Sequence, residues 1–416
     1  MAPPVDPPVI IAGRAARFDG RGELEAWTSW NTALDLEMRF YAQCPAEHGY
    51  PRFVYATFLD GDWNVVAERD DTIPASQNGM GILSYLKYRK LRGDPDGSRL
   101  RIACAMGDYL VRETLTPASG KYPGFTRSTG RRSEFPLSAN AGSQADRPYE
   151  IEPDKGGIAG YALMCLFEAS GAPRYLAQGL QNARVLAANQ RLGDAFQSPW
   201  PFRADHRNGD PRGPVSGNMV HILRLYDRLI ARGYDEFSEP RRALFAWIKG
   251  YQIPSAATDG ALFAQFFEDH DTPTNRTAWA PLNLARYWLE EASALDSQWR
   301  AASESLIDFV RRNFTQREFG VTVCHEQDED ADAWGGVNST YGAVLALYAK
   351  AVGSSALARE ARQALDFTLY SIDEQGQPRD LYKNGAPGGW QQDAHTDVVH
   401  NYVDALTAFP DWGDSR

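Results

Sequence analysis

The chain has 416 residues, a formal net charge of -11, 43% hydrophobic residues and 23% charged residues. This composition is typical of a globular protein, and no apolar run approaches the roughly 20 residues that cross a bilayer, so a soluble protein with no membrane partner is expected. The acidic balance argues against nucleic acid as a partner, because a phosphate-binding face needs an excess of basic side chains.

The N-terminal segment, M-A-P-P-V-D-P-P-V-I-I-A-G, has no basic stretch followed by an apolar one. No signal peptide is therefore predicted, and the compartment stays open between cytoplasmic, periplasmic and secreted. Four widely spaced cysteines without a C-x-x-C pair exclude a zinc ribbon and a dense disulfide framework. The first predicted helix covers 24–42. After it, F-V-Y-A-T-F-L-D-G-D-W-N-V-V (53–66) predicts a β-hairpin of two short strands around an Asp-Gly turn.

Six segments in the rest of the chain share one pattern: a long polar and aromatic loop, a start rich in small residues, and a helix rich in Ala, Leu and Tyr. These helices start near Asn78, Gly156, Ser216, Arg276, Asn338 and Thr396. The starts lie about 60 residues apart, which fits two helices and their loops. Second helices are predicted over 98–113, 173–190, 239–251, 297–314 and 356–370.

The sixth of these helices, 396–408, has no second helix after it, and helix 24–42 has no inner partner. If the two pack together, six helical hairpins close into a ring. The sequence therefore predicts an all-α fold, an (α/α)6 toroid of six helical hairpins over a single domain 1–416, with the small β-hairpin at its rim.

This arrangement resembles the (α/α)6 toroid of the six-hairpin glycosidase superfamily and its polysaccharide lyase relatives. The resemblance covers about 24–408 and rests on the order and spacing of the helices. It implies that the substrate cleft lies where the long loops lead into the inner helices, and that the substrate is a glycan.

Carboxylates in these long loops are the first candidates for catalysis, because glycosidic cleavage needs one carboxyl as acid and one as base or nucleophile. Asp154 in E-P-D-K-G-G directly precedes an inner helix, and Glu326 lies in C-H-E-Q-D-E-D-A-D-A-W-G-G. Asp154 is alternatively an ordinary helix N-cap. The acidic loop is alternatively solvated, or binds calcium near Asp328 and Asp330; no other cofactor or metal is predicted.

The loop S-P-W-P-F-R-A-D-H-R-N-G-D-P-R-G is predicted to form one wall of the cleft. The prolines on either side of Trp200 stiffen the chain, so its ring is held ready to stack on a sugar. Arg203 is predicted to contact the substrate, and Asp205 or His206 to assist the acid-base step, across the cleft from Asp154 and Glu326.

Further substrate-binding candidates lie in the other long loops. Guanidinium groups in these loops suit a uronate carboxylate, or alternatively pair with nearby aspartates. Tryptophans there are candidates for stacking on sugars, or alternatively pack against the protein. The segment D-A-H-T-D-V-V-H also allows a metal site, but its spacing favours a hydrogen-bonded polar pair. The candidates are Arg131, Arg276, Trp334, Trp390, His395 and Asp397.

We therefore expect a carbohydrate-active enzyme with an oligo- or polysaccharide substrate. Acid-base hydrolysis of a glycan that contains an acidic sugar is the first hypothesis. β-Elimination by a polysaccharide lyase is the alternative, because His206 beside Arg203 offers a base and a group that neutralises a uronate. A terpene-cyclase-like toroid ranks last, because the loops are too polar for a hydrocarbon substrate.

Overall fold

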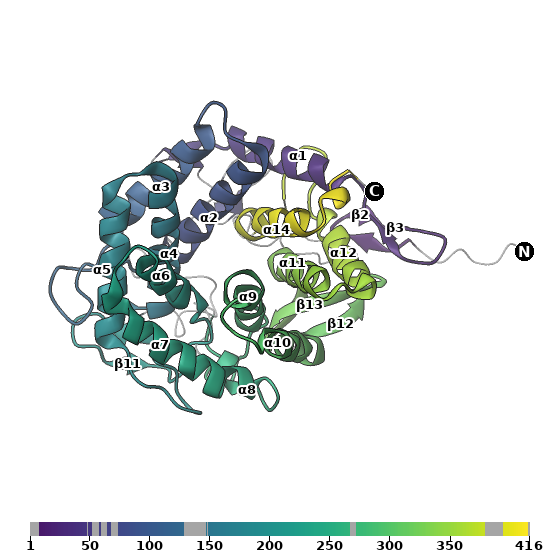
Figure 1. The fold of residues 1–416 in the computed structure, drawn as a ribbon. Coiled ribbons are helices and arrows are strands. Elements are labelled where there is room, and N and C mark those ends of the chain that lie inside the picture. Colours follow the sequence, from purple (N-terminus) through teal and green to yellow (C-terminus); the bar gives the residue numbers. More distant parts are fainter. Residues whose placement is uncertain are drawn as a thin grey trace, which may run out of the picture.

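The computed structural model describes residues 8–47, 49–51, 58–59, 65–67, 74–128, 147, 149–266, 272–378 and 394–414. In this part of the chain six inner helices surround the centre of a ring and six outer helices pack around them (Figure 1). The inner helices are α2 (Pro74–Arg92), α4 (Pro153–Ser170), α6 (Val220–Ile230), α9 (Trp279–Tyr287), α11 (Gly335–Val352) and α14 (His400–Ala408). The outer helices are α1 (Trp30–Gln43), α3 (Ser98–Glu113), α5 (Pro173–Asn189), α7 (Ser238–Trp247), α10 (Trp299–Phe314) and α12 (Ser355–Leu369).

Several helices of the ring are extended by π-helical or short helical segments. The π-helical segment η3 (Ile248–Gln252) continues α7, η5 (Trp288–Ala292) continues α9, and η6 (Ala394–Val399) leads into α14. Short helices are η2 (Asp235–Phe237), α8 (Ile253–Ser255), η4 (Ala261–Phe263) and η7 (Pro410–Trp412).

All strands pair antiparallel and form small sheets outside the helical core. The three-stranded sheets are β9 (Glu150–Ile151) with β10 (Arg203–Asp205) and β11 (Pro211–Arg212), and β12 (Thr315–Glu318) with β13 (Val321–Gln327) and β14 (Asp330–Ala333). The pairs are β1 (Ile10–Ile11) with β2 (Arg14–Ala15), β3 (Arg17–Phe18) with β4 (Leu24–Glu25), and β5 (Ala46–Glu47) with β6 (Tyr50–Pro51). The predicted hairpin is present as β7 (Phe58–Leu59) paired with β8 (Val65–Ala67), and its turn lies outside the described residues.

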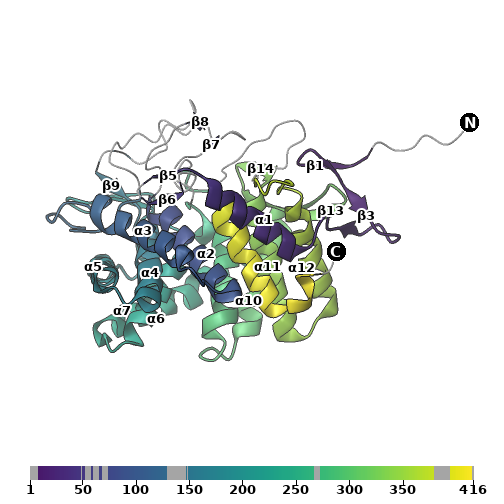
Figure 2. The same ribbon diagram turned by 90° about the horizontal axis from the view of Figure 1, so that it is seen from above.

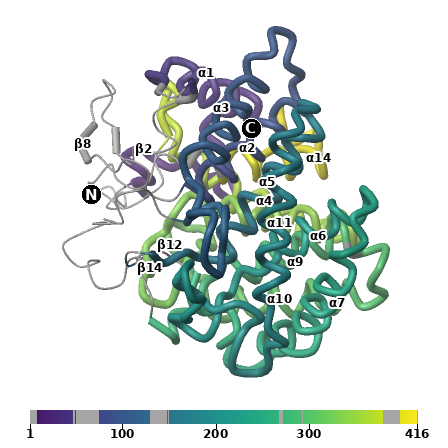
Figure 3. The backbone as a smooth tube through the Cα atoms, turned by 90° about the vertical axis from the view of Figure 1, so that its left-hand side faces the viewer, coloured from purple at the N-terminus to yellow at the C-terminus, as the bar shows by residue number. Residues whose placement is uncertain are grey.

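The inner helices all begin at one end of the ring, which we call the loop end. Strand β9 directly precedes α4 and strand β14 directly precedes α11. Both strands lie at the same end of the ring (Figure 2), and Figure 3 places β12 and β14 at this edge. The first turns of the inner helices therefore converge on the loop end.

Small residues let the inner helices approach one another closely. A Cβ atom added to Gly157 of α4 would lie 2.5 Å from the Ile222 side chain of α6, and one added to Gly160 would lie 2.7 Å from Leu225. Inner helices such as α4 and α11 are buried on nearly every side, whereas the outer helices have one apolar face. The centre of the ring is consequently narrow and shaped by individual side chains.

The ring closes where α1 lies beside α14. The Trp30 ring stacks on Tyr402 with 5.7 Å between centroids, and Trp30 Nε1 donates to Asp366 Oδ1 at 2.7 Å. Helix α1 begins at Trp30, not at residue 24 as predicted, because Ser29 caps it and Leu24–Glu25 pair as strand β4.

Candidate active site

Two predicted site carboxylates, Glu326 and Asp397, lie near Trp279 at the loop end. Trp279 is the first residue of α9, and its Nε1 donates to Glu326 Oε2 of β13 at 3.4 Å. A Cβ atom on Gly336 of α11 would lie 3.1 Å from this ring and 3.5 Å from Asp397 Oδ2 of η6. The missing side chain at Gly336 therefore lets Trp279 and Asp397 approach each other, and Glu326 and Asp397 share one neighbour.

Asp154 occupies a different environment. It is the second residue of α4, fully buried, with Oδ2 3.8 Å from Lys155 Nζ. Lys155 Nζ donates to the Phe266 carbonyl at 2.8 Å. The helix N-cap is Glu152, so the simple N-cap interpretation of Asp154 is wrong. Its role as an acid or base together with Glu326 stays a prediction.

The structure places Trp200 and Arg203 inside the protein. Trp200 is fully buried, and its Nε1 donates to the Leu186 carbonyl at 3.0 Å, so the ring packs in the core in this conformation. Arg203 Nε lies 3.2 Å from Glu152 Oε1, and both side chains are fully buried. This ion pair ties β10 to the start of α4.

Asp205 and His206 follow on the same sheet, nearer the surface. Asp205 accepts hydrogen bonds from Arg207, which lower the pKa of this carboxyl. The backbone N–H of His206 donates to the Tyr149 carbonyl at 2.9 Å, and the two rings lie 5.9 Å apart. Burial lowers the pKa of His206, against the opposite influence of Asp205. The imidazole is therefore neutral at pH 7.

The acidic loop uses its carboxylates within the protein. Arg276 binds Asp328 in a bidentate manner, with Nε–Oδ2 2.8 Å and Nη2–Oδ1 2.9 Å. Trp334 Nε1 donates to Asp330 Oδ2 at 3.0 Å. Within the described ranges, no three His, Cys, Asp or Glu side chains gather as metal ligands would.

The side chains of three predicted residues lie outside the described part of the structure. Arg131 and Trp390 lie outside the described residues. The backbone of His395 belongs to η6, but its side chain lies outside the described part. Their proposed contacts with substrate stay predictions.

A small cavity occupies the centre of the ring, where five inner helical segments meet. It offers about 40 Å³ to water molecules, room for roughly three of them. Its apolar lining consists of Met80, Leu83 and Val220. Its polar lining consists of Lys87, Tyr161, His221, Arg224, Asn283, Arg286, Glu290 and His400.

His221 and His400 face this cavity from opposite sides. They lie at the starts of α6 and α14, the third and the sixth inner helices, which are half a ring apart (Figure 1). Both are almost fully buried, and both Nδ1 atoms have no hydrogen-bond partner among the described residues. Burial, with Arg224 and Arg286 nearby, lowers the pKa of His221 to about 3. Burial, with Lys87 nearby, holds the pKa of His400 well below its usual value, so both rings are neutral at pH 7.

The carboxylates of the cavity are bound to cations. Glu290 Oε2 lies 3.0 Å from Arg224 Nη2, and Asp404 Oδ2 lies 3.6 Å from Arg286 Nη1. Burial opposes the ionisation of Glu290, but Lys87, Arg224 and Arg286 outweigh it and lower its pKa to about 2. The carboxylates of the cavity are thus held as ions, whereas each imidazole keeps one ring nitrogen, Nδ1, without a partner among the described residues.

The sequence contains a signal for this histidine pair, although neither histidine is among the predicted catalytic or substrate-binding residues. Two of the six repeats carry the same local pattern, N-M-V-H at 218–221 and D-V-V-H at 397–400. Repeats three positions apart face each other in a closed ring of six, so equal positions in them meet across the centre. His221 was not among the predicted residues, and His400 was considered only as part of a metal or polar pair.

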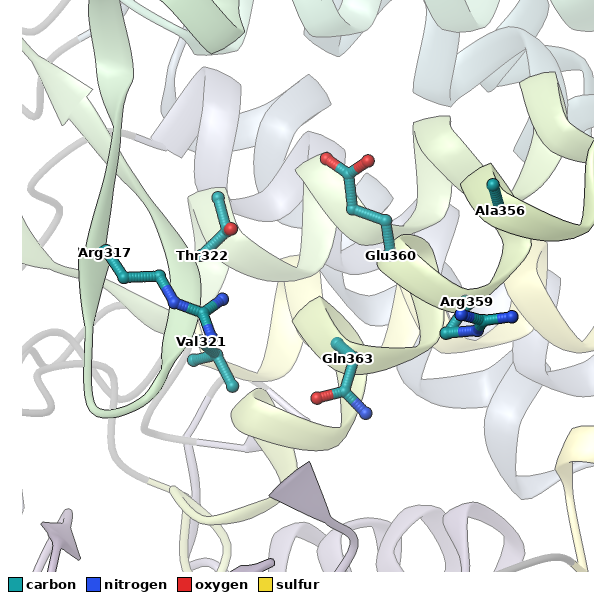
Figure 4. A pocket seen from close by; sticks show the side chains of 7 residues that line it. All are labelled: Arg317, Val321, Thr322, Ala356, Arg359, Glu360 and Gln363. Atoms are coloured by element: carbon teal, nitrogen blue, oxygen red, sulfur yellow. The ribbon is translucent and has the colours of Figure 1, made fainter. Parts of the chain in front are cut away.

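A second cavity lies outside the ring, between the β12–β13 hairpin and α12 (Figure 4). Its volume is about 190 Å³. Glu360 accepts from the Tyr341 hydroxyl at 2.6 Å, and both polar atoms of the Gln363 amide bind the backbone of Leu24. Because these groups already serve the fold, the central cavity and the loop end remain the candidate site.

Comparisons with known proteins support the fold. No family model and no curated protein matches the sequence. The structure of a D-mannose isomerase is similar with TM-score 0.67 and 12% identity over 91% of this chain and 97% of that one. The cellobiose 2-epimerase of Spirochaeta thermophila DSM 6192 gives TM-score 0.65 and 13% identity over 92% and 96%. A family 76 glycoside hydrolase from a bovine Bacteroides thetaiotaomicron strain gives 0.60 and 12% over 92% and 78%.

These similarities confirm the predicted fold, an (α/α)6 toroid of the kind found in the six-hairpin glycosidase superfamily. The three similar proteins include two that rearrange sugars and one that hydrolyses glycosides, so the toroid alone does not select a reaction. No helix in the described residues has both the length and the apolar character required to cross a membrane.

Proposed function

We propose that the protein is a carbohydrate-active enzyme that isomerises or epimerises a sugar by moving a proton at the carbon next to its carbonyl group. The observation that carries this proposal is the pair of neutral imidazoles, His221 and His400, on opposite walls of the central cavity. A planar enediolate has two faces, and epimerisation needs a proton acceptor on one and a proton donor on the other.

The surroundings of the pair suit an anionic intermediate. Arg224 and Arg286 lie close enough to His221 to lower its pKa, so they also stabilise negative charge that develops beside it. This offsets the low basicity that they impose on the ring. Under this proposal the carbonyl end of an open-chain sugar takes the place of the roughly three waters that fit the cavity.

Proton exchange with solvent tests the proposal. The protein is incubated in D2O with a panel of free aldoses and disaccharides, and proton NMR follows loss of the C2 proton signal and appearance of an epimer or ketose. We expect His221→Gln and His400→Gln each to lower kcat by about 100-fold or more. His325→Gln on β13 is the matched control with wild-type turnover. If no sugar in the panel shows either exchange or a new product, this function is ruled out.

A second candidate is cleavage of a glycosidic bond, in a glycan that contains an acidic sugar. It is favoured by the two carboxylates Glu326 and Asp397, which both lie near Trp279 at the loop end. Uronate and neutral glycans are compared for new reducing ends, and for absorbance of an unsaturated product that would indicate a lyase. Under this candidate Glu326→Gln and Asp397→Asn abolish cleavage while His221→Gln retains it, the reverse of the pattern expected for isomerisation.

A further inference from the structure

Lys87 of α2 contacts the imidazole of His400 on the neighbouring inner helix α14. Its Nζ lies 2.9 Å from His400 Nε2 and donates to Asp404 Oδ1. Glu290 Oε1 lies 3.9 Å from the same nitrogen. Lys87 thus lies between one imidazole and two carboxylates.

A charged lysine decides which nitrogen of the imidazole carries the proton. An ammonium group has three donors and no acceptor, so the contact at 2.9 Å exists only if His400 Nε2 offers its lone pair. A neutral ring then holds its hydrogen on Nδ1, and a doubly protonated ring would direct an N–H at the ammonium. Nδ1 is buried and has no acceptor among the described residues.

Asp404 alone would favour a hydrogen on Nε2, but this carboxylate is already bound to Lys87 and Arg286. Asp404 Oδ2 on the same helix lies 3.8 Å from Nε2, and Arg286 of α9 lies 3.6 Å from that carboxylate. Arg224 and the neutral His221 face the cavity from α6. Lysine and arginines together disfavour a charged imidazole, which agrees with the lowered pKa of His400.

We propose that Lys87 is a positioning residue that fixes His400 as the Nδ1–H tautomer and returns a proton to it during turnover. The tautomer follows from the contact alone, whereas the part in turnover rests on the proposed isomerisation.

The proton transfer balances without a further reactant. The His400 Nδ1–H bond breaks as a bond forms between this proton and the substrate carbon or oxygen. At the same time a Lys87 Nζ–H bond breaks and the Nε2–H bond forms, so the ring stays neutral and the lysine becomes neutral. The resting state returns when Nδ1 takes up a proton from water in the emptied cavity and the Nε2–H proton passes back to the neutral Lys87 Nζ, 2.9 Å away.

The tautomer is measured directly on the full-length protein labelled with ¹⁵N-histidine. Long-range proton–nitrogen correlation spectra are recorded for the wild-type protein and for His400→Gln. The ring signals that are missing from the variant belong to His400. We expect a pyrrole-type shift for Nδ1 and a pyridine-type shift for Nε2, unchanged from pH 6 to 8. A pyrrole-type Nε2 in the wild-type protein would overturn the proposal, whether or not any variant folds.

Variants then test the part in turnover. Lys87→Met is expected to bring in the Nε2–H tautomer and to lower kcat about tenfold or more with a smaller change in KM, whereas Lys87→Arg keeps the Nδ1–H form. Lys90→Met, an exposed position on the same helix, is the control. An unchanged tautomer in a folded Lys87→Met protein contradicts the proposal. The expected tautomers without any sugar conversion would leave the positioning intact and remove the isomerase function.

Discussion

The buried ion pair between Arg203 and Glu152 tests whether the loop 198–213 stabilises the fold or binds substrate. Both side chains are fully buried, with 3.2 Å between Arg203 Nε and Glu152 Oε1. Arg203→Met leaves a carboxylate without its main counter-ion in the interior, which costs about 3–5 kcal/mol. With an unfolding entropy of about 2.1 cal/mol/K per residue over 416 residues, Tm falls by roughly 3–6 °C.

Differential scanning calorimetry and urea unfolding measure this loss, and two variants complete the experiment. Arg207→Met removes an exposed ion pair with Asp205, in which the arginine side chain is 54% exposed, and is expected to cost less than about 1 kcal/mol. The double variant Glu152→Gln with Arg203→Met should recover at least half of the loss, because no uncompensated charge remains.

The opposite result would restore the substrate-binding role of Arg203 expected from the sequence. That role requires the guanidinium to face the ligand. Arg203→Met would then leave Tm within the range of the Arg207→Met control while raising KM for an acidic sugar. Such an outcome would refute the reasoning from burial. It would mean that the ion pair with Glu152 contributes little to the free energy of unfolding.

Two further predictions concern stability. The pKa of His221 is about 3 in the folded protein and about 6.5 in the unfolded chain, so only the unfolded chain takes up this proton as pH falls between these values. The free energy of unfolding therefore decreases by up to about 1.4 kcal/mol per pH unit below about 6.5, and His221→Gln should flatten this slope in urea titrations at pH 7 and pH 5. Gly157→Ala places a methyl group 2.5 Å from Ile222 and should destabilise by about 1–3 kcal/mol, whereas Gly250→Ala, with no atom within 4 Å, should be neutral or slightly stabilising; equal effects of the two would contradict the close packing of α4 and α6.

The helical hairpins were predictable because their signals are local. Helix α3 covers the predicted 98–113, and α5 starts at the predicted Pro173, since a proline in the first turn fits a helix start. Gly171 before it adopts φ +71°, the left-handed conformation that ends α4. Such residues mark a boundary whatever the rest of the chain does, and the regular spacing of boundaries then gives the ring.

The orientation of individual side chains was not predictable from the same signals. Trp200 lies between prolines in a polar loop, and this sequence is compatible with an exposed ring or a buried one. In the structure the ring is buried, because its Nε1 donates a hydrogen bond to the carbonyl of Leu186 on the preceding outer helix. Arg203 behaves in the same way, because its partner Glu152 lies far away in the sequence. The composition of this loop predicted a functional region, but partners distant in the sequence determine which of its side chains can face a ligand.

The charge balance of the cavity separates the two kinds of substrate considered. Arg224 and Arg286 are held by Glu290, Glu291 and Asp404, so a sugar carboxylate that enters the centre must displace one of these acids. A neutral sugar needs no such exchange and still finds donors and acceptors in the imidazoles. We therefore expect the centre of the ring to favour neutral sugars, and any recognition of an acidic sugar to occur at the loop end. Burial, with the same arginines nearby, keeps both imidazoles neutral. The arginines that help to prepare the histidines for proton transfer are therefore the ones whose bound acids exclude an acidic ligand.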